Sequence, residues 1–296
     1  MSTESQAAAA LRQFPRRWHR LRREWAGWLG LALVTLVLLM GAFGPLLNLP
    51  NPDFNDLGAR LMAPTLSLAG FGPHPLGTDQ LGRDILSRIV FGSRITLLVS
   101  VCAVTLGGVV GISIGLIAGY FGGPLDRILM RLVDIQLAMP LMLLALMVVA
   151  ATGTSLGNLI AVLALTSWVR YARIVRGQVL SVRERDFVRS ARAIGAGTLR
   201  ILLHHILPNV LAPSLVVATL ELGRVILLEA ALSFLGLGIQ PPAPSWGGML
   251  AEGRVYAASA WWIITLPGLA LMLTVLGVNL AGDWLRDRLD PREAHL

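Results

Sequence analysis

Four stretches of this chain contain no charged residue, and each is long enough to cross a lipid bilayer. They are Trp25–Leu47, Ile95–Leu125, Ile135–Val169 and Val255–Gly282. A membrane-spanning helix needs about 20 mostly apolar residues. Hydrophobic residues make up 55% of the 296 residues and charged residues only 14%, which is too few charges to cover a water-soluble protein of this size. The sequence therefore predicts an all-α membrane protein.

The breaks between the apolar stretches predict about six spans. Ile135–Val169 would be roughly 52 Å long as one helix, against a hydrocarbon core of about 30 Å, so the turn-forming residues 152–158 are expected to divide it. A short charged turn is expected at 126–134. The predicted spans are 25–47, 95–120, 135–151, 157–175, 210–235 and 260–281.

The distribution of arginine predicts the orientation. All 25 positively charged residues are Arg, and 19 of them fall in segments that six spans place on one side. The positive-inside rule assigns that side to the cytoplasm. We expect a cytoplasmic Arg-rich N-terminus (1–24), an outer segment (48–94), a five-helix permease core (95–281) and a cytoplasmic tail (282–296), with a cytoplasmic loop at 176–208 and an outer loop at 236–259. Since these Arg residues gather at membrane ends, the net charge of +8 does not predict nucleic-acid binding.

Several kinds of chemistry are excluded by residues that the chain lacks. It contains no Lys, so neither a P-loop for ATP nor a Schiff-base lysine is possible. Cys102 is the single cysteine, and the adjacent His204 and His205 would point about 100° apart on a helix. We therefore predict no catalytic, cofactor-binding or metal-binding residue in this chain. If its work uses ATP, another chain binds the nucleotide.

Three segments near or within the membrane are candidates for function. In the second span, a small residue at every fourth position predicts a groove for close helix packing, either within this chain or against a moving neighbour. In the fifth span, ionisable groups at membrane depth predict a pathway or mutual pairing. On the outer side, 77–94 is expected to form an amphipathic helix, with Asp84 and Arg88 on its polar face. The small residues of the second span are Gly107, Gly111, Gly115 and Gly119. The ionisable residues of the fifth span are Glu221, Arg224 and Glu229.

The most informative segment is the cytoplasmic loop. Asp186 is expected to cap a short helix that Gly195 closes, and Thr198 to cap a second helix that Pro208 stops. Two short helices of this kind form a projecting knob and leave no room for a catalytic pocket.

This loop resembles the coupling segment of ATP-binding-cassette importer permeases. The family pattern is Glu-Ala-Ala, three residues, Gly, nine residues, then Ile-x-Leu-Pro. Gly195 and Leu207-Pro208 are in register with it, and Ala191 matches its second Ala, whereas Arg189, Ser190 and His205 replace Glu, Ala and Ile. The resemblance implies an ATPase-coupling surface formed by Asp186, Phe187, Arg189, Ala191, Arg192, Ile194, Gly195, Leu207 and Pro208.

Two outer segments resemble the C-type permease of dipeptide, oligopeptide and nickel importers. They are 74–84 (HPLGTDQLGRD) and 232–247 (LSFLGLGIQPPAPSWG). The resemblance implies a permease of the type I importer fold in the bacterial inner membrane. It also implies a homologous second permease, two ATPase subunits that bind ATP and Mg²⁺, and an extracytoplasmic substrate-binding protein.

The leading prediction is therefore a non-catalytic permease subunit for di- or oligopeptides that works by alternating access. Within the same class, a nickel-chelate or glutathione permease is the alternative. An ion-coupled secondary transporter would require ionisable groups in several spans, yet four of the predicted spans have none. A membrane-embedded enzyme would require clustered His, Asp or Glu at membrane depth, and only the fifth span offers any such residues.

Overall fold

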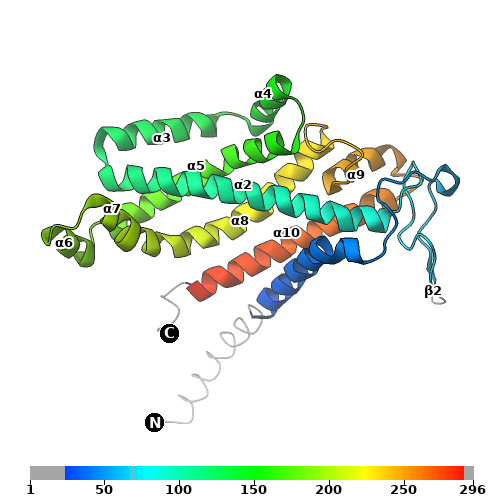
Figure 1. Ribbon diagram of the computed structural model, residues 1–296, viewed down its shortest axis with the longest axis horizontal. Helices are drawn as coiled ribbons and strands as arrows, with labels where there is room; N and C mark the ends of the chain where they lie inside the picture. Colours follow the sequence, from blue (N-terminus) through cyan, green and yellow to red (C-terminus); the bar gives the residue numbers. More distant parts are fainter. Residues whose placement is uncertain (1–23, 68–69, 290–296) are drawn as a thin grey trace, which may run out of the picture.

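A computed structural model describes residues 24–67 and 70–289 of the chain (Figure 1). Most of these residues are helical. The longest mainly non-helical segments are 47–84, which includes a short antiparallel hairpin of two-residue strands, and 235–245. The long elements are a first helix Glu24–Phe43, α2 (Ile85–Phe121), α3 (Gly123–Ala138), α4 (Leu141–Thr152), α5 (Leu156–Val182), α8 (Leu207–Phe234) and α10 (Trp262–Leu289). The short elements are η1 (Gly44–Leu46), η2 (Leu57–Ala59), β1 (Leu66–Ser67), β2 (Gly70–Phe71), α6 (Asp186–Ala193), α7 (Thr198–Arg200), η3 (Ile201–Ile206), α9 (Trp246–Gly253) and η4 (Arg254–Tyr256).

The predicted all-α membrane fold is confirmed, but the number of apolar spans differs from six. Among the described helices, the first helix, α2, α5 and α10 are long and apolar enough to cross a membrane, and the bent pair α3–α4 makes a fifth if it counts as one span. The remaining predicted span, α8, is 28 residues long and carries Glu221, Arg224 and Glu229. α8 is therefore long enough to cross a membrane, but these ionisable side chains reduce its apolar character.

The predicted third span is wrong as a straight helix. α3 and α4 meet at an angle of 91°. The break falls at Met139 and Pro140, both of which have extended backbone conformations. Proline has no N–H for a helical hydrogen bond and disfavours the helical conformation in the residue before it. The charged residues at 126–134 consequently lie inside α3, where the sequence predicted a turn.

The predicted amphipathic helix at 77–94 is also corrected. The Asp84 side chain accepts a hydrogen bond from the Ser87 N–H and caps α2, which runs without a break from Ile85 to Phe121. Arg88, expected on a polar outer face, is 2% exposed. Residues 77–84 instead form a turn closed by a bridge between Thr78 and Asp84. The helix begins after Asp84 because a side chain at the cap position satisfies free N–H groups of a helix start.

α2 and α5 pack closely along the glycine stripe of α2. A Cβ atom on Gly107 would lie 2.8 Å from the Cβ of Ser167, and one on Gly115 would lie 2.8 Å from the Ala172 carbonyl oxygen. Both separations are too short for a real side chain. The groove is therefore filled by α5 of the same chain.

The bundle has two distinct ends. α6 and α7 lie at one end, and α9 and the hairpin lie at the opposite end (Figure 1). The first helix begins beside the end of α10, where the rings of Trp28 and Trp284 are 6.3 Å apart.

Candidate functional site

The segment between α5 and α8 forms a projecting knob at one end of the bundle (Figure 1). α6 is followed by a turn at Ile194 and Gly195, then by α7 and the π-helix η3, which runs directly into α8. The prediction that Pro208 stops the second helix is wrong. Pro208 lies in the first turn of α8, where its missing N–H removes no helical hydrogen bond.

The inner face of the knob packs against the bundle. Val188 and Ala191 of α6 are buried in one apolar cluster with Ile201 and Ile206 of η3 and with residues of α5. Ala191 is only 6% exposed, so its prediction as a contact residue for a partner is corrected. The knob cannot turn relative to α5 without exposing this cluster.

The knob exposes four large apolar side chains. Ile194 is 85% exposed and Phe187 is 40% exposed, in agreement with their predicted outward positions. Leu199 and Leu203 are also exposed, at 69% and 45%. Sequence reasoning missed both, although their spacing of four residues on the second helix places them on the same side. We call Phe187, Ile194, Leu199 and Leu203 the apolar knob surface.

The charged residues of the knob contact groups within the chain. Arg189 donates a 3.1 Å hydrogen bond to Glu184, which lowers the pKa of that carboxyl group and keeps it ionised. Arg192 lies 5.0 Å from the centre of the Tyr120 ring. Asp186 is the first residue of α6, after Arg185 at the cap position, so the predicted Asp186 cap is wrong. Its charge still complements the positive end of the helix dipole.

Gly195 ends α6 in the left-handed conformation, with a φ of +81°. The Gly195 N–H donates to the Arg192 carbonyl, and the next N–H, of Ala196, donates to the Ala191 carbonyl. These bonds satisfy the last carbonyl groups of α6. The second helix begins after Gly197, without a side-chain cap, so the predicted Thr198 cap is wrong as well.

The ionisable residues of α8 form two separate clusters. Glu221 is 2% exposed and accepts hydrogen bonds from Arg224, and it also contacts Arg170 of α5, which sequence reasoning did not place there. Glu229 is fully buried. It accepts hydrogen bonds from Ser233 at 2.8 Å and from Thr96 of α2 at 3.3 Å, and so links α8 to α2.

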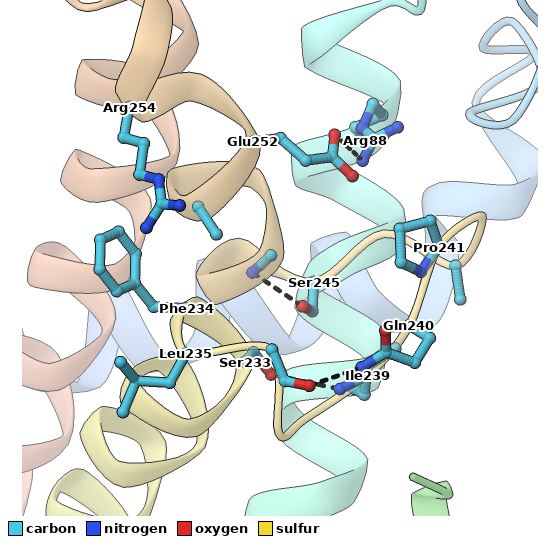
Figure 2. Close-up of a pocket in the computed structure, with 14 residues that line it drawn as sticks. Arg88, Ser233, Phe234, Leu235, Ile239, Gln240, Pro241, Ser245, Glu252 and Arg254 are labelled. Atoms are coloured by element: carbon cyan, nitrogen blue, oxygen red, sulfur yellow. Dashed lines mark hydrogen bonds and ion pairs between the residues drawn. The ribbon is translucent and has the colours of Figure 1, made fainter.

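A cavity of about 400 Å³ opens at the end opposite the knob (Figure 2). The end of α8 and the following loop form one wall, and α9 forms the other. Arg88 of α2 meets Glu252 of α9 at its edge, with 3.2 Å between Nη2 and Oε2. Sequence reasoning did not select this cavity, because its residues come from three segments that only the tertiary structure brings together.

Two family models match the chain. The model described as "Binding-protein-dependent transport system inner membrane component" matches residues 111–295. The model described as "N-terminal TM domain of oligopeptide transport permease C" matches residues 13–64.

Individual relatives match along most of their length. The dipeptide transport system permease protein DppC of Escherichia coli (strain K12) is 46% identical over 93% of this chain and 92% of its own. The di/tripeptide transport system permease protein DppC of Pseudomonas aeruginosa (strain UCBPP-PA14) is 43% identical over 89% of this chain and 87% of its own. A solved structure of the MetNI methionine ABC transporter, described as inward facing, aligns with a TM-score of 0.56 at 21% identity and covers 69% of this chain and 96% of its own. That last likeness concerns the fold alone.

Proposed function

Since the chain belongs to the family of binding-protein-dependent transport system inner membrane components, we propose that it moves di- and oligopeptides across the bacterial inner membrane as one permease subunit of an ATP-driven importer. The observation that carries this proposal is the 46% identity to a dipeptide permease over 93% of the chain. The alternative cargoes, nickel chelates and glutathione, do not occur in the names of the relatives compared above.

The composition of the chain fits a transporter driven by other chains. The absence of Lys excludes a P-loop anywhere in the sequence. In this proposal, two partner ATPase subunits bind ATP and Mg²⁺, a homologous permease completes the pathway, and an extracytoplasmic binding protein delivers the peptide.

The knob supplies a mechanical connection to the partner ATPases. Its exposed apolar side chains are available for a partner, and its buried face is packed on α5. Because η3 continues into α8, a displacement of the knob moves both α5 and α8. Those two helices carry the Glu221–Arg170 contact. ATPase closure can thereby rearrange the spans between outward-open and inward-open states.

Reconstitution tests the proposed function. The complex of both permeases and both ATPase subunits is placed in proteoliposomes with the binding protein. ATP hydrolysis and uptake are then measured with dipeptides, oligopeptides, glutathione and nickel chelates. We expect peptides to stimulate both activities. Stimulation by nickel complexes alone would contradict the peptide assignment, and uptake driven by a proton gradient without ATP would contradict the importer class.

A further inference from the structure

The cavity at the end opposite the knob has a charged side whose hydrogen-bonding capacity is not used up. The Arg88 side chain is 2% exposed. Its Nη2 atom donates to Glu252, and its Nη1 atom forms an ion pair with the Asp79 carboxylate at 3.5 Å. Arg88 is therefore engaged within the protein, and it holds Glu252 at the edge of the cavity.

Two further charged groups complete this side. Arg254 lies 5.9 Å from the centre of the Phe234 ring and makes no ion pair with any residue that the structure describes. Glu252 accepts hydrogen bonds from Gln80, Arg83 and Arg88, and all three donors bind its Oε2 atom. Its Oε1 atom therefore accepts no hydrogen bond from the described part of the chain. The cavity thus offers the guanidinium group of Arg254 and a free carboxylate oxygen of Glu252 together.

The other side of the cavity is mainly apolar. Phe234 and Leu235 line it from the end of α8, and Ile239 and Pro241 line it from the following loop (Figure 2). A volume of about 400 Å³ falls within the range of small-ligand pockets. An extended dipeptide is about 7 Å long and carries an ammonium group, a carboxylate and two side chains.

We propose that this cavity is an outer subsite that binds a short zwitterionic peptide on its way into the permease. The peptide carboxylate accepts hydrogen bonds from Arg254, and the ammonium group donates to Oε1 of Glu252. One peptide side chain lies against Phe234 and Ile239. This inference rests on the proposed peptide transport and adds a binding site within this subunit.

The site is also connected to the interior of the bundle. Ser233, which lines the cavity, donates to the buried Glu229 and accepts a 3.4 Å hydrogen bond from the Ile239 N–H. Glu229 in turn accepts a hydrogen bond from Thr96 of α2. A peptide that moves the loop at Ile239 consequently acts on the contact between α2 and α8.

Photoaffinity labelling of the assembled complex tests the proposal. The complex of both permeases and both ATPase subunits is placed in nanodiscs without the binding protein, and the probe is alanyl-photoleucine. We expect label within residues 233–254. Alanyl-alanine should compete with the probe, whereas its C-terminal amide should compete about tenfold less well, the factor expected for one lost charged hydrogen bond.

Two variants provide the comparison. Arg254→Gln should reduce labelling about tenfold, because it removes a charged donor from an exposed position with little effect on folding. Arg60→Gln, which changes another exposed Arg outside the cavity, should label like the wild type. Equal competition by the acid and the amide, or unchanged labelling of Arg254→Gln, would overturn the proposal.

A parallel uptake assay separates this inference from the proposed function. Binding-protein-dependent uptake of alanyl-alanine is measured in proteoliposomes with the same preparation. Uptake without label in 233–254 would overturn the subsite and leave peptide transport standing. Failure of every peptide to be taken up would overturn both. Label in 233–254 together with uptake, with the differences between variants described above, supports the subsite.

Discussion

Glu221 of α8 and Arg170 of α5 form an ion pair across the two helices, with 3.3 Å between Oε1 and Nη1. Each residue lies near the middle of its helix. Arg224 binds the other oxygen of the same carboxylate, with 2.6 Å between Nη2 and Oε2. Two guanidinium groups thus share one carboxylate. The Glu221 side chain is buried, at 3% exposed, whereas the Arg170 side chain is 55% exposed. Charged groups at membrane depth are costly without such partners.

Replacing this carboxylate should destabilise the subunit. Glu221→Gln leaves Arg224 and Arg170 without an anion, and breaking a buried pair in this way costs about 3 kcal/mol. Arg170→Gln should cost about 1 kcal/mol or less, because that side chain is largely exposed. Thermal unfolding of the assembled complex in nanodiscs measures both. Equal losses for the two variants would contradict a buried pair centred on Glu221.

The glycine stripe of α2 should not accept a large side chain. Gly115→Leu would place a side chain against the backbone of α5, so we expect an overpacking cost of about 3 kcal/mol and a loss of assembled complex. Gly177 of α5 is the control, because a Cβ there meets nothing within 4 Å. Size-exclusion chromatography in detergent measures assembly. Intact assembly of Gly115→Leu would show that α2 and α5 separate easily.

Gly195 should be required for its backbone conformation alone. A Cβ there meets nothing within 4 Å, but its φ of +81° is unfavourable for a β-branched residue. Gly195→Val should therefore leave the spans inserted and abolish peptide-stimulated ATP hydrolysis and transport. Gly197→Val is a matched control two residues away, since Gly197 has equal space and a φ of −66°. Wild-type stimulation in the assembled Gly195→Val complex would show that the knob is not the coupling element.

The apolar knob surface should contribute to ATPase binding. Burying one large aliphatic side chain contributes about 1.5–3 kcal/mol, so Ile194→Ser should weaken binding of the ATPase subunits about tenfold or more. Val255→Ser changes a side chain that is 78% exposed at the opposite end and should have no effect. Titration of fluorescently labelled ATPase into permease nanodiscs measures the affinities. Equal affinity for both variants would place the ATPase contact elsewhere.

Local patterns in the sequence were sufficient for several features. The left-handed turn at Gly195 follows from a glycine after an apolar helical repeat, and the break between α4 and α5 follows from the turn-forming residues 152–158. The Glu221–Arg224 contact follows from their spacing of three residues on one helix. Each of these features depends on neighbours within about two helical turns.

Other features depended on segments distant in the sequence. The local pattern predicts Arg88 on a polar surface. In the structure it is buried and donates a hydrogen bond to Glu252, 164 residues later in the chain. Ala191 and Ile194 lie on the same short apolar pattern, but only packing against η3 and α5 decides that one is buried and the other exposed. The missing N–H of Pro140 is a local signal for the bend. The prediction overlooked it because residues 135–169 are all uncharged and were divided only at 152–158.

The sequence by itself determined that the chain crosses a membrane and that it binds no ATP through a P-loop. Those conclusions depend on composition and on the lengths of uncharged stretches, which the chain carries without folding. The prediction of a coupling loop depended instead on the resemblance of residues 189–208 to a known family pattern. Tertiary structure alone decided which charges are buried together, because the cost of a buried charge depends on partners supplied by other helices. It placed Arg170 beside Glu221, closed α5 over the glycines of α2, and assembled the outer cavity from α2, α8 and α9.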